Sequence, residues 1–247
     1  MNKRARPVFS ISHDRWSVQL TDDGSRTLID PSTSVAFHSA SGGLAETKHV
    51  YFENSGVGSR LRRGAPTAVL EIGLGLGMGC LVTLDAARTH DCPITYTAIE
   101  NAWLPVEVLR ELKFEELLEH PSLVSEFLSW RESLGRVVET GEHEYQFSDT
   151  ETLLVDHCDA LTWDRASEGS FDAIYLDPFA PNENPELWTV EFFSRLNRVL
   201  KPNGCLVSYC VNRRVREALS SAGFKPEAVP GPPGGKRETL RALKGNV

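Results

Sequence analysis

The segment Ala68-Val-Leu-Glu-Ile-Gly-Leu-Gly-Leu-Gly-Met-Gly-Cys80 decides the fold of this chain. Its aliphatic run ends at Ile72, glycines follow at positions 73, 75, 77 and 79, and an apolar helical pattern begins at Met78. This order is typical of a strand, a tight turn and a helix. Glycines let a ligand approach the bare backbone, and the first N–H groups of a helix are free to donate hydrogen bonds. The segment therefore predicts a ligand-binding turn in an α/β fold.

Spacing and charge indicate which ligand this turn binds. The dinucleotide fingerprint needs glycines at i, i+2 and i+5, and neither the count from Gly73 nor that from Gly75 ends on a glycine. Glu71 precedes the first glycine, where a carboxylate repels a pyrophosphate but attracts a cation. S-adenosyl-L-methionine (SAM) carries an ammonium and a sulfonium. We therefore predict that Glu71, Gly73, Gly75 and Gly77 bind SAM, and a glycine-rich turn without a ligand is the alternative.

Strand and helix patterns alternate from this turn to the end of the sequence. They predict an α/β, Rossmann-like sheet of seven mostly parallel strands, closed by a β-hairpin at one edge. The strands are expected at residues 68–72, 94–100, 152–156, 171–177, 205–210, 224–229 and 238–243. An N-terminal extension, residues 1–66, contains a predicted β-hairpin at 16–20 and 26–29 and a segment at 37–51 that is expected to lie over the mouth of the main domain, residues 67–247.

Three further carboxylates stand where predicted strands end, at Glu100, Asp159 and Asp177. Open α/β sheets bind their ligands at these carboxyl ends. Glu100 lies 23 positions beyond Gly77, close to where nucleotide-binding folds place the carboxylate that holds the ribose hydroxyls. Asp159 is expected to accept a hydrogen bond from the adenine amino group. A surface glutamate at a strand end remains the alternative for Glu100.

Asp177-Pro-Phe179 resembles the Asn/Asp-Pro-Pro-aromatic signature of methyltransferases that act on amino nitrogens. An amine attacks a methyl group only through a free lone pair, so a neighbouring carboxylate can hold or accept its proton. We therefore predict that Asp177 is catalytic and that Phe179 stacks against a base. Asp-Pro is also a common way for a strand to end. This tripeptide by itself therefore does not identify a methyltransferase.

Composition limits the possible partners. The 247 residues carry a net charge of −8, which disfavours nucleic-acid binding through overall charge and leaves local basic patches. No apolar run approaches the roughly 20 residues of a membrane span, no signal peptide is apparent, and the five cysteines form no C-x-x-C pair. We expect a cytoplasmic protein without membrane contact or metal, in which His38 and His49 form hydrogen bonds. The basic patches are Arg60-Leu-Arg62-Arg63, Arg213-Arg214-Val-Arg216, and Lys236-Arg237 with Arg241.

Longer motifs resemble the methyltransferase domain of MnmC, the tRNA 5-methylaminomethyl-2-thiouridine biosynthesis family. The motifs are Glu71-Ile-Gly-x-Gly-x-Gly, Thr97-Ala-Ile-Glu100, Leu176-Asp-Pro-Phe-Ala-Pro-x-x-Asn-Pro-Glu-Leu-Trp188, Gly234-Gly-Lys-Arg-Glu238 and His38-Ser-x-x-Gly-Gly-Leu-x-Glu-Thr-x-His-Val50. The resemblance implies that residues 67–247 are a SAM-dependent methyltransferase domain. It implies methyl transfer to the exocyclic amine of 5-aminomethyluridine, with or without 2-thiolation, at the wobble position of tRNA.

The same resemblance implies roles for single residues. Asp177 would engage the acceptor amine, and substrate contacts would come from Phe179, Pro181, Lys236 and Arg237. In the bifunctional members a glycine follows the aspartate, where this chain has Pro178, and a FAD-dependent oxidase domain follows the methyltransferase domain. This sequence is therefore expected to be a stand-alone form. Two alternatives remain: methylation of another amine, in a small molecule or a protein, and a non-catalytic subunit that keeps the SAM-binding fold.

Overall fold

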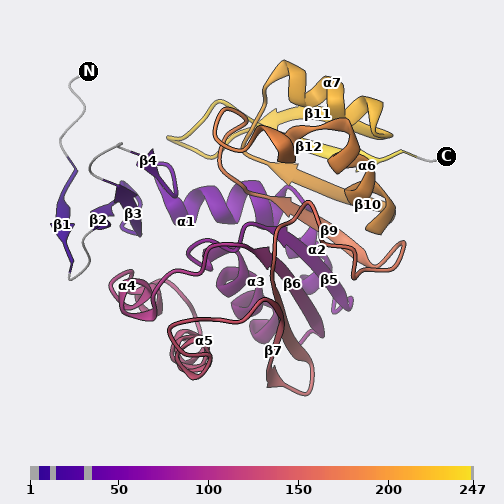
Figure 1. The fold of residues 1–247 in the computed structure, drawn as a ribbon. Helices are drawn as coiled ribbons and strands as arrows, with labels where there is room; N and C mark the ends of the chain where they lie inside the picture. Colours follow the sequence, from indigo (N-terminus) through magenta and orange to yellow (C-terminus); the bar gives the residue numbers. More distant parts are fainter. Residues whose placement is uncertain (1–5, 12–14, 31–34, 246–247) are drawn as a thin grey trace.

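The structure is a computed structural model that describes residues 6–11, 15–30 and 35–245. Its described strands form two sheets (Figure 1). The small N-terminal sheet is antiparallel, in the order β1 (Val8–Ser10), β2 (Ser17–Leu20), β3 (Arg26–Asp30) and β4 (Val35–Ala36). The expected hairpin is present as β2 and β3, and β1 and β4 extend it on its two sides.

The large sheet has the strand order β11-β12-β10-β9-β5-β6-β8-β7. Its five central strands are mutually parallel, whereas β7 and β12 run antiparallel to their neighbours. The mostly parallel Rossmann-like sheet is thus confirmed, but the described residues form eight strands instead of seven. The strands are β5 (Thr67–Ile72), β6 (Ile94–Glu100), β7 (Gly141–Ser148), β8 (Glu151–His157), β9 (Phe171–Leu176), β10 (Leu200–Ser208), β11 (Phe224–Pro230) and β12 (Glu238–Lys244).

The additional strand is β7, which pairs with β8 at the edge of the sheet. Its side chains alternate between half-buried and exposed, so it is a polar edge strand with one covered face. On that face the ring of Tyr145 lies 5.9 Å from the ring of Trp130, between centroids. The alternation is visible in the sequence, but the many charged and polar residues of the exposed face obscure it.

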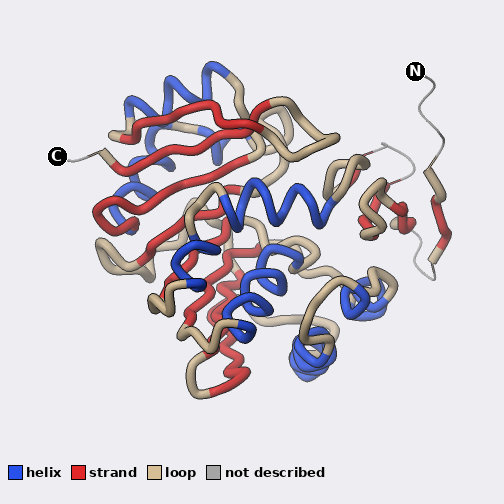
Figure 2. Tube along the Cα trace, turned by 180° about the vertical axis from the view of Figure 1, so that it is seen from behind, coloured by secondary structure: helices blue, strands red, loops and turns tan. Residues whose placement is uncertain are grey.

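Helices cover both faces of the large sheet (Figures 1 and 2). Consecutive residues of β5 show the division, because Val69 packs into the core on one face and Leu70 into the core on the other. The first core includes α2, α3, α5 and the π-helix η1, and the second includes α6 and α7. The helices are α1 (Gly43–Glu46), η1 (Thr47–Glu53), α2 (Val57–Arg62), α3 (Met78–Thr89), α4 (Val106–Arg110), η2 (Phe114–Glu116), α5 (Ser122–Ser133), η3 (Pro185–Trp188), α6 (Val190–Val199) and α7 (Arg213–Ser221).

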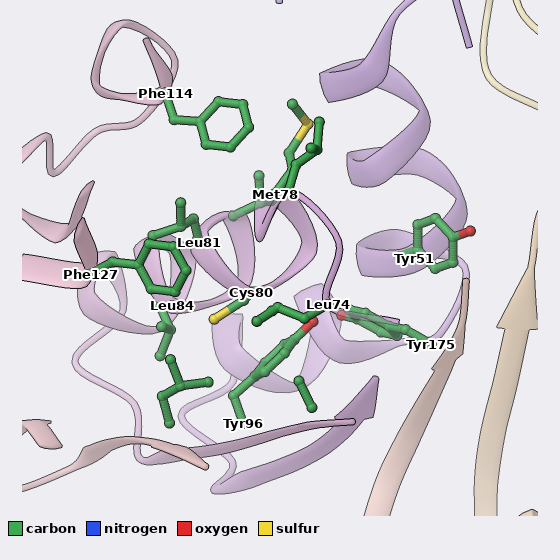
Figure 3. Packing of buried hydrophobic residues seen from close by; sticks show 14 of the residues in the cluster. Tyr51, Leu74, Met78, Cys80, Leu81, Leu84, Tyr96, Phe114, Phe127 and Tyr175 are labelled. Atoms are coloured by element: carbon green, nitrogen blue, oxygen red, sulfur yellow. The ribbon is translucent and has the colours of Figure 1, made fainter. Parts of the chain in front are cut away.

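The core around α3 fixes the glycine turn (Figure 3). Leu81 and Leu84 of α3 pack there with Phe127 of α5, and all three side chains are at most 1% exposed. Full burial of a side chain of this size contributes roughly 1.5–3 kcal/mol. The start of α3, and with it the turn from Gly73, is therefore held against the sheet by packing.

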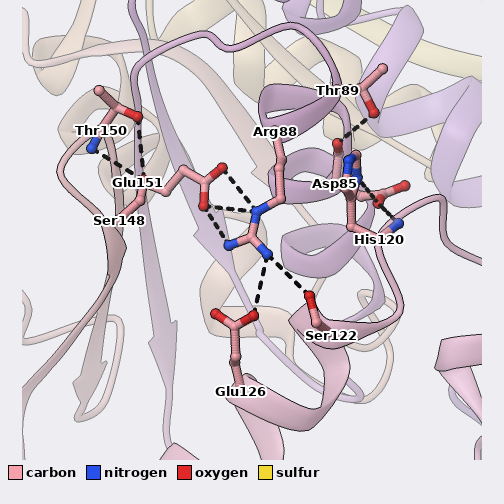
Figure 4. Close-up of polar contacts among 9 residues, drawn as sticks. All are labelled: Asp85, Arg88, Thr89, His120, Ser122, Glu126, Ser148, Thr150 and Glu151. Carbon is pink, nitrogen blue, oxygen red and sulfur yellow. Dashed lines mark hydrogen bonds and ion pairs between the residues drawn. The ribbon is translucent and has the colours of Figure 1, made fainter.

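A polar network joins the other end of α3 to the sheet (Figure 4). Arg88 donates hydrogen bonds to Glu151 at the start of β8, the shortest of them 2.6 Å, and to Glu126 of α5 at 3.3 Å. The hydrogen bonds that Arg88 donates to Glu151 are the main reason that the pKa of Arg88 lies above its usual range. Since the Glu151 side chain is only 6% exposed, loss of this pair would leave a buried carboxylate unpaired.

Two further properties follow from the described residues. None of their helices is both long enough and apolar enough to cross a membrane. All five cysteines are unpaired thiols, four of them buried, and Cys158 is half-buried.

Candidate active site

A cavity of about 940 Å³ opens at the carboxyl ends of β5, β6, β8 and β9. All four of the carboxylates expected at the site, Glu71, Glu100, Asp159 and Asp177, line this cavity. Parallel strands bring their carboxyl ends to one edge of the sheet, which explains why residues so distant in sequence meet here. The N-terminal extension also contributes to the lining, with residues 35–39 and Glu46, Thr47 and Tyr51.

Glu71 is buried in the cavity wall without full hydrogen bonding. Its residue is 3% exposed, and its Oε2 atom has no hydrogen-bond partner among the described residues. Burial, followed by the charge of Asp177, raises the pKa of Glu71 well above its usual range. Gly79 in the first turn of α3 leaves room for this side chain, because a Cβ atom there would lie 2.4 Å from Glu71 Oε1. A cationic ligand group would supply the partner that the carboxylate lacks.

Gly73 and Gly75 line the cavity, with φ values of 91° and 51° that glycine tolerates best. Gly77, at φ 82°, is outside the cavity lining. A Cβ atom on Gly77 would lie 3.1 Å from the ring of Phe127, so the left-handed backbone at the start of α3 and close packing explain this glycine. The expected contact of Gly77 with the cofactor stays a prediction.

Glu100 is held by two backbone N–H groups. Its Oε2 accepts from Gly75 and its Oε1 from Ala102, each at 2.8 Å. Burial raises the pKa of Glu100, and these N–H groups oppose the rise because they stabilise the carboxylate. Each carboxylate oxygen has two lone pairs. Both Oε1 and Oε2 of Glu100 can therefore accept one more hydrogen bond, as from a ribose hydroxyl.

Asp159 lies at the exposed end of the cavity. Its Oδ1 accepts a hydrogen bond from the Leu161 N–H at 2.9 Å, which fixes the carboxylate after β8. Trp103 provides an aromatic surface in the same cavity, and the guanidinium carbon of Arg131 lies 3.7 Å from a ring centroid of Trp103. The carboxylate and the indole together offer a hydrogen-bond acceptor and a flat apolar surface, which suit a purine.

Asp177 follows β9 directly and is held by the N-terminal extension. The hydroxyl of Tyr51, on η1, donates a short hydrogen bond to Asp177 Oδ1. The Tyr51 ring packs 5.6 Å from that of Tyr175, between centroids, and Figure 3 shows its hydroxyl pointing away from Met78 and Leu81. Burial raises the pKa of Asp177 to about 8, while the Tyr51 hydrogen bond opposes that rise. Near neutral pH the carboxyl group is therefore mostly protonated and poised to exchange a proton.

The mouth of the cavity has an aromatic and a cationic side. Phe179 is 42% exposed and lines the mouth beside Phe37, with 5.5 Å between ring centroids. Lys236, from the β11–β12 turn, places its ammonium 4.1 Å from the ring centroid of Tyr209. Phe179 and Lys236 are thus where an incoming base and a phosphate could be contacted.

Other predicted substrate contacts are not brought to the cavity. Pro181 and Arg237 are outside its lining, and their contact with the substrate stays a prediction. Much of the remaining basic charge is neutralised by neighbouring carboxylates and does not form free patches. These ion pairs are Arg60–Asp172 at 3.0 Å, Arg62–Glu53 at 2.8 Å, Arg213–Glu217 at 2.8 Å and Arg241–Glu227 at 2.6 Å.

Glu46, Tyr51 and Tyr209 have no role predicted from the sequence, although all three line the cavity. Glu46 and Tyr51 belong to the segment 37–51 that was expected over the mouth, so their position was signalled but their contacts were not. Tyr209 lies just beyond β10 and donates a hydrogen bond to the Pro178 carbonyl at 2.9 Å. It therefore holds the loop that carries Phe179.

Comparison with known proteins agrees with this geometry. A family model described as S-adenosyl-L-methionine-dependent methyltransferase matches residues 128–245. The tRNA 5-methylaminomethyl-2-thiouridine biosynthesis bifunctional protein MnmC of Aromatoleum aromaticum is 31% identical over 247 residues, which cover 95% of this chain and 36% of that protein. MnmC of Leptospira interrogans is 32% identical over 236 residues, covering 90% and 34%. The chain spans about a third of the length of these relatives.

Solved structures lead to the same group. MnmC2 from Aquifex aeolicus is 25% identical, with a TM-score of 0.74 over 97% of this chain and 74% of that one. Spermidine synthase from Thermotoga maritima, at 16% identity and a TM-score of 0.58 over 97% and 72%, shares the fold. The chain has the fold of S-adenosyl-L-methionine-dependent methyltransferases and is similar to the MnmC proteins over nearly its whole length.

Proposed function

We propose that this protein transfers a methyl group from SAM to the primary amine of a 5-aminomethyluridine, with or without 2-thiolation, at the wobble position of tRNA. The observation that carries the proposal is the convergence of Glu71 and Asp177 on one cavity. One carboxylate suits a cationic methyl donor, and the other suits an amine acceptor. The names of the MnmC relatives, which refer to tRNA 5-methylaminomethyl-2-thiouridine biosynthesis, supply the substrate class.

The residues present fit SAM. The unpartnered Oε2 of Glu71 is a buried acceptor for its ammonium, and the bare backbone of Gly73 and Gly75 permits close approach. Glu100 would hold the ribose hydroxyls, and Asp159 the adenine amino group. In their ionised forms, the lining carboxylates would also favour the positive charge of a sulfonium.

Bound SAM supplies a methyl carbon on a cationic sulfur, and the amine lone pair forms the N–C bond while the electron pair of the breaking C–S bond stays on sulfur. The acceptor reaches the site mainly as an alkylammonium, so it must first lose a proton. Asp177 in its ionised form accepts that proton and aims the resulting lone pair, and Tyr51 fixes the carboxylate through Oδ1.

The RNA partner must bind an acidic protein of net charge −8. Phe179 offers an exposed ring for base stacking at the cavity mouth, and Lys236 offers a nearby positive charge. We assign to these two residues the contact with the wobble nucleotide and its phosphate. The anticodon loop is single-stranded, so its bases can be splayed out into such a pocket.

The same overall charge favours a second candidate, methyl transfer to an amine of a small molecule or a protein. The two are separated by incubating the protein with methyl-labelled SAM and, in turn, undermodified tRNA, protein and metabolite fractions. Our proposal expects label in the tRNA alone, dependent on Asp177. Label that enters only the protein or metabolite fraction would refute the tRNA substrate and support the second candidate.

A further inference from the structure

The acceptor end of the cavity contains a second carboxylate besides Asp177. Glu46 is the last residue of α1 and directly precedes η1, is 8% exposed, and lines the same cavity. Figure 1 shows this helical segment running from the small sheet toward the middle of the large sheet. A carboxylate on this segment thus lines the site from outside the Rossmann-like domain.

The π-helical winding explains how Glu46 and Tyr51 reach one site. The hydrogen bond from the Asn54 N–H to the His49 carbonyl, 3.1 Å long, spans five residues, as is typical of a π-helix. Side chains five residues apart then lie closer to a common face than they would in an α-helix. Glu46 and Tyr51 are five residues apart, and both line the cavity. π-helical turns frequently occur at functional sites.

Glu46 has spare capacity to bind a cation. Its Oε2 accepts one hydrogen bond, from the Ser39 N–H at 3.1 Å, and no lysine or arginine of the described residues forms an ion pair with it. A buried carboxylate with so little compensation is costly to a fold unless a ligand completes it. An alkylammonium carries both the charge and the N–H donors that would do so.

The charges around Asp177 come from several elements. Glu46 acts from α1, Lys236 from the β11–β12 turn and Glu71 from β5, while the phenols of Tyr51 and Tyr209 are also close. Burial is the main cause of the raised pKa of Asp177, the negative charge of Glu46 adds to it, and Lys236 opposes it. Removal of the Glu46 charge should therefore lower that pKa.

We propose that Glu46 binds the protonated acceptor amine together with Asp177, so that the N-terminal extension supplies the residue that selects an alkylammonium. This inference rests on the proposed amine methylation and names a substrate-binding residue for it. The ammonium donates to Glu46, one of its protons passes to the ionised carboxylate of Asp177, and the freed lone pair becomes the nucleophile. After transfer, the methylammonium product again carries a proton and a positive charge opposite Glu46.

The test compares Glu46→Gln with the wild type in methylation of undermodified tRNA. We expect KM for tRNA to rise about 10-fold or more, as for loss of a hydrogen bond to a charged group. The inflection of kcat/KM against pH should move to lower pH, while the Kd for SAM stays within about 2-fold. The matched control is Glu53→Gln at the end of η1. Glu53 pairs with Arg62 at the surface, 2.8 Å apart, and its substitution should not change the kinetics.

A second measurement uses the wild type alone and keeps the inference testable if Glu46→Gln does not fold. The probes are the nucleosides 5-aminomethyluridine and 5-hydroxymethyluridine as inhibitors of tRNA methylation. We expect the amine to inhibit at least 10-fold more strongly than the alcohol below pH 8. Equal inhibition by the two nucleosides, or unchanged KM and pH profile in Glu46→Gln, would overturn the role of Glu46. Absence of tRNA methylation by the wild type would instead overturn the proposed function.

Discussion

The pH dependence of methyl transfer is the sharpest consequence of the environment of Asp177. Burial raises its pKa to about 8, and the ionised form is the one that accepts a proton from the amine. With that pKa, the ionised fraction is about 10% at pH 7 and about 90% at pH 9. We therefore expect kcat/KM to rise about 9-fold over this interval and to level off above it, because kcat/KM reports the ionisation of the free enzyme.

The assay is methylation of undermodified tRNA with labelled SAM, measured between pH 6 and pH 10 at tRNA concentrations below KM. Asp177→Asn should lower the rate about 10²- to 10⁴-fold, the usual contribution of a positioned acid or base, while SAM still binds. The Tyr51→Phe variant shows whether the inflection of the pH profile comes from Asp177 or from the substrate amine. Removal of its hydrogen bond eliminates a contact that lowers the pKa of Asp177, so the inflection should move to higher pH.

Three results would refute this reasoning. They are a flat profile between pH 7 and pH 9, an inflection that stays in place in Tyr51→Phe, and near-normal turnover by Asp177→Asn. Any of them would mean that Asp177 does not accept the proton of the acceptor amine.

Further predictions concern the cofactor pocket and the fold. Glu71→Gln should weaken SAM binding about 10- to 150-fold in calorimetry, through loss of a charge-assisted hydrogen bond. The same variant should not destabilise the free protein at pH 8. The folded-state pKa of Glu71 is raised, so the stability this group contributes is complete below its unfolded pKa and is lost as pH rises through the folded value. Gly79→Ala, whose Cβ would lie 2.4 Å from Glu71 Oε1, should displace that carboxylate and weaken SAM binding at least as much. Arg88→Met should lower the free energy of unfolding by about 3 kcal/mol in urea, since it leaves Glu151 unpaired, with the Kd for SAM unchanged.

Each of these predictions has an outcome that contradicts it. Wild-type SAM affinity in Glu71→Gln would show that the orphaned carboxylate does not bind the cofactor. Unchanged affinity in Gly79→Ala would mean that the first turn of α3 tolerates a side chain over Glu71. Unchanged urea unfolding in Arg88→Met would show that the network of Figure 4 has no net stabilising effect.

The positions of the four site carboxylates could be predicted from the sequence because parallel topology constrains where strand ends lie. Once the strands ending near Glu71, Glu100, Asp159 and Asp177 were recognised, the fold itself brought these residues to one cavity. The glycine pattern was harder to interpret, because a glycine needed for ligand approach and one needed for packing look alike. Gly77 is of the second kind, and its neighbour Phe127 lies 50 residues further along the chain.

Contacts from the N-terminal extension could not be predicted in the same way. The positions of Glu46 and Tyr51 depend on the docking of η1 against the large sheet and on its π-helical winding, and local sequence specifies neither. β7 was missed for a different reason, since a half-exposed edge strand has little hydrophobic signal. The chemistry of a strand end is thus easier to derive from sequence than the residues that another segment contributes to it.

Nucleoside mass spectrometry of undermodified tRNA, incubated with SAM and this protein, tests the central claim most directly. The account predicts conversion of 5-aminomethyluridine or its 2-thio form into the corresponding methylaminomethyl nucleoside, and loss of that conversion in Asp177→Asn. An unchanged nucleoside profile from protein that binds SAM, or the methyl group on any other nucleoside, would contradict it.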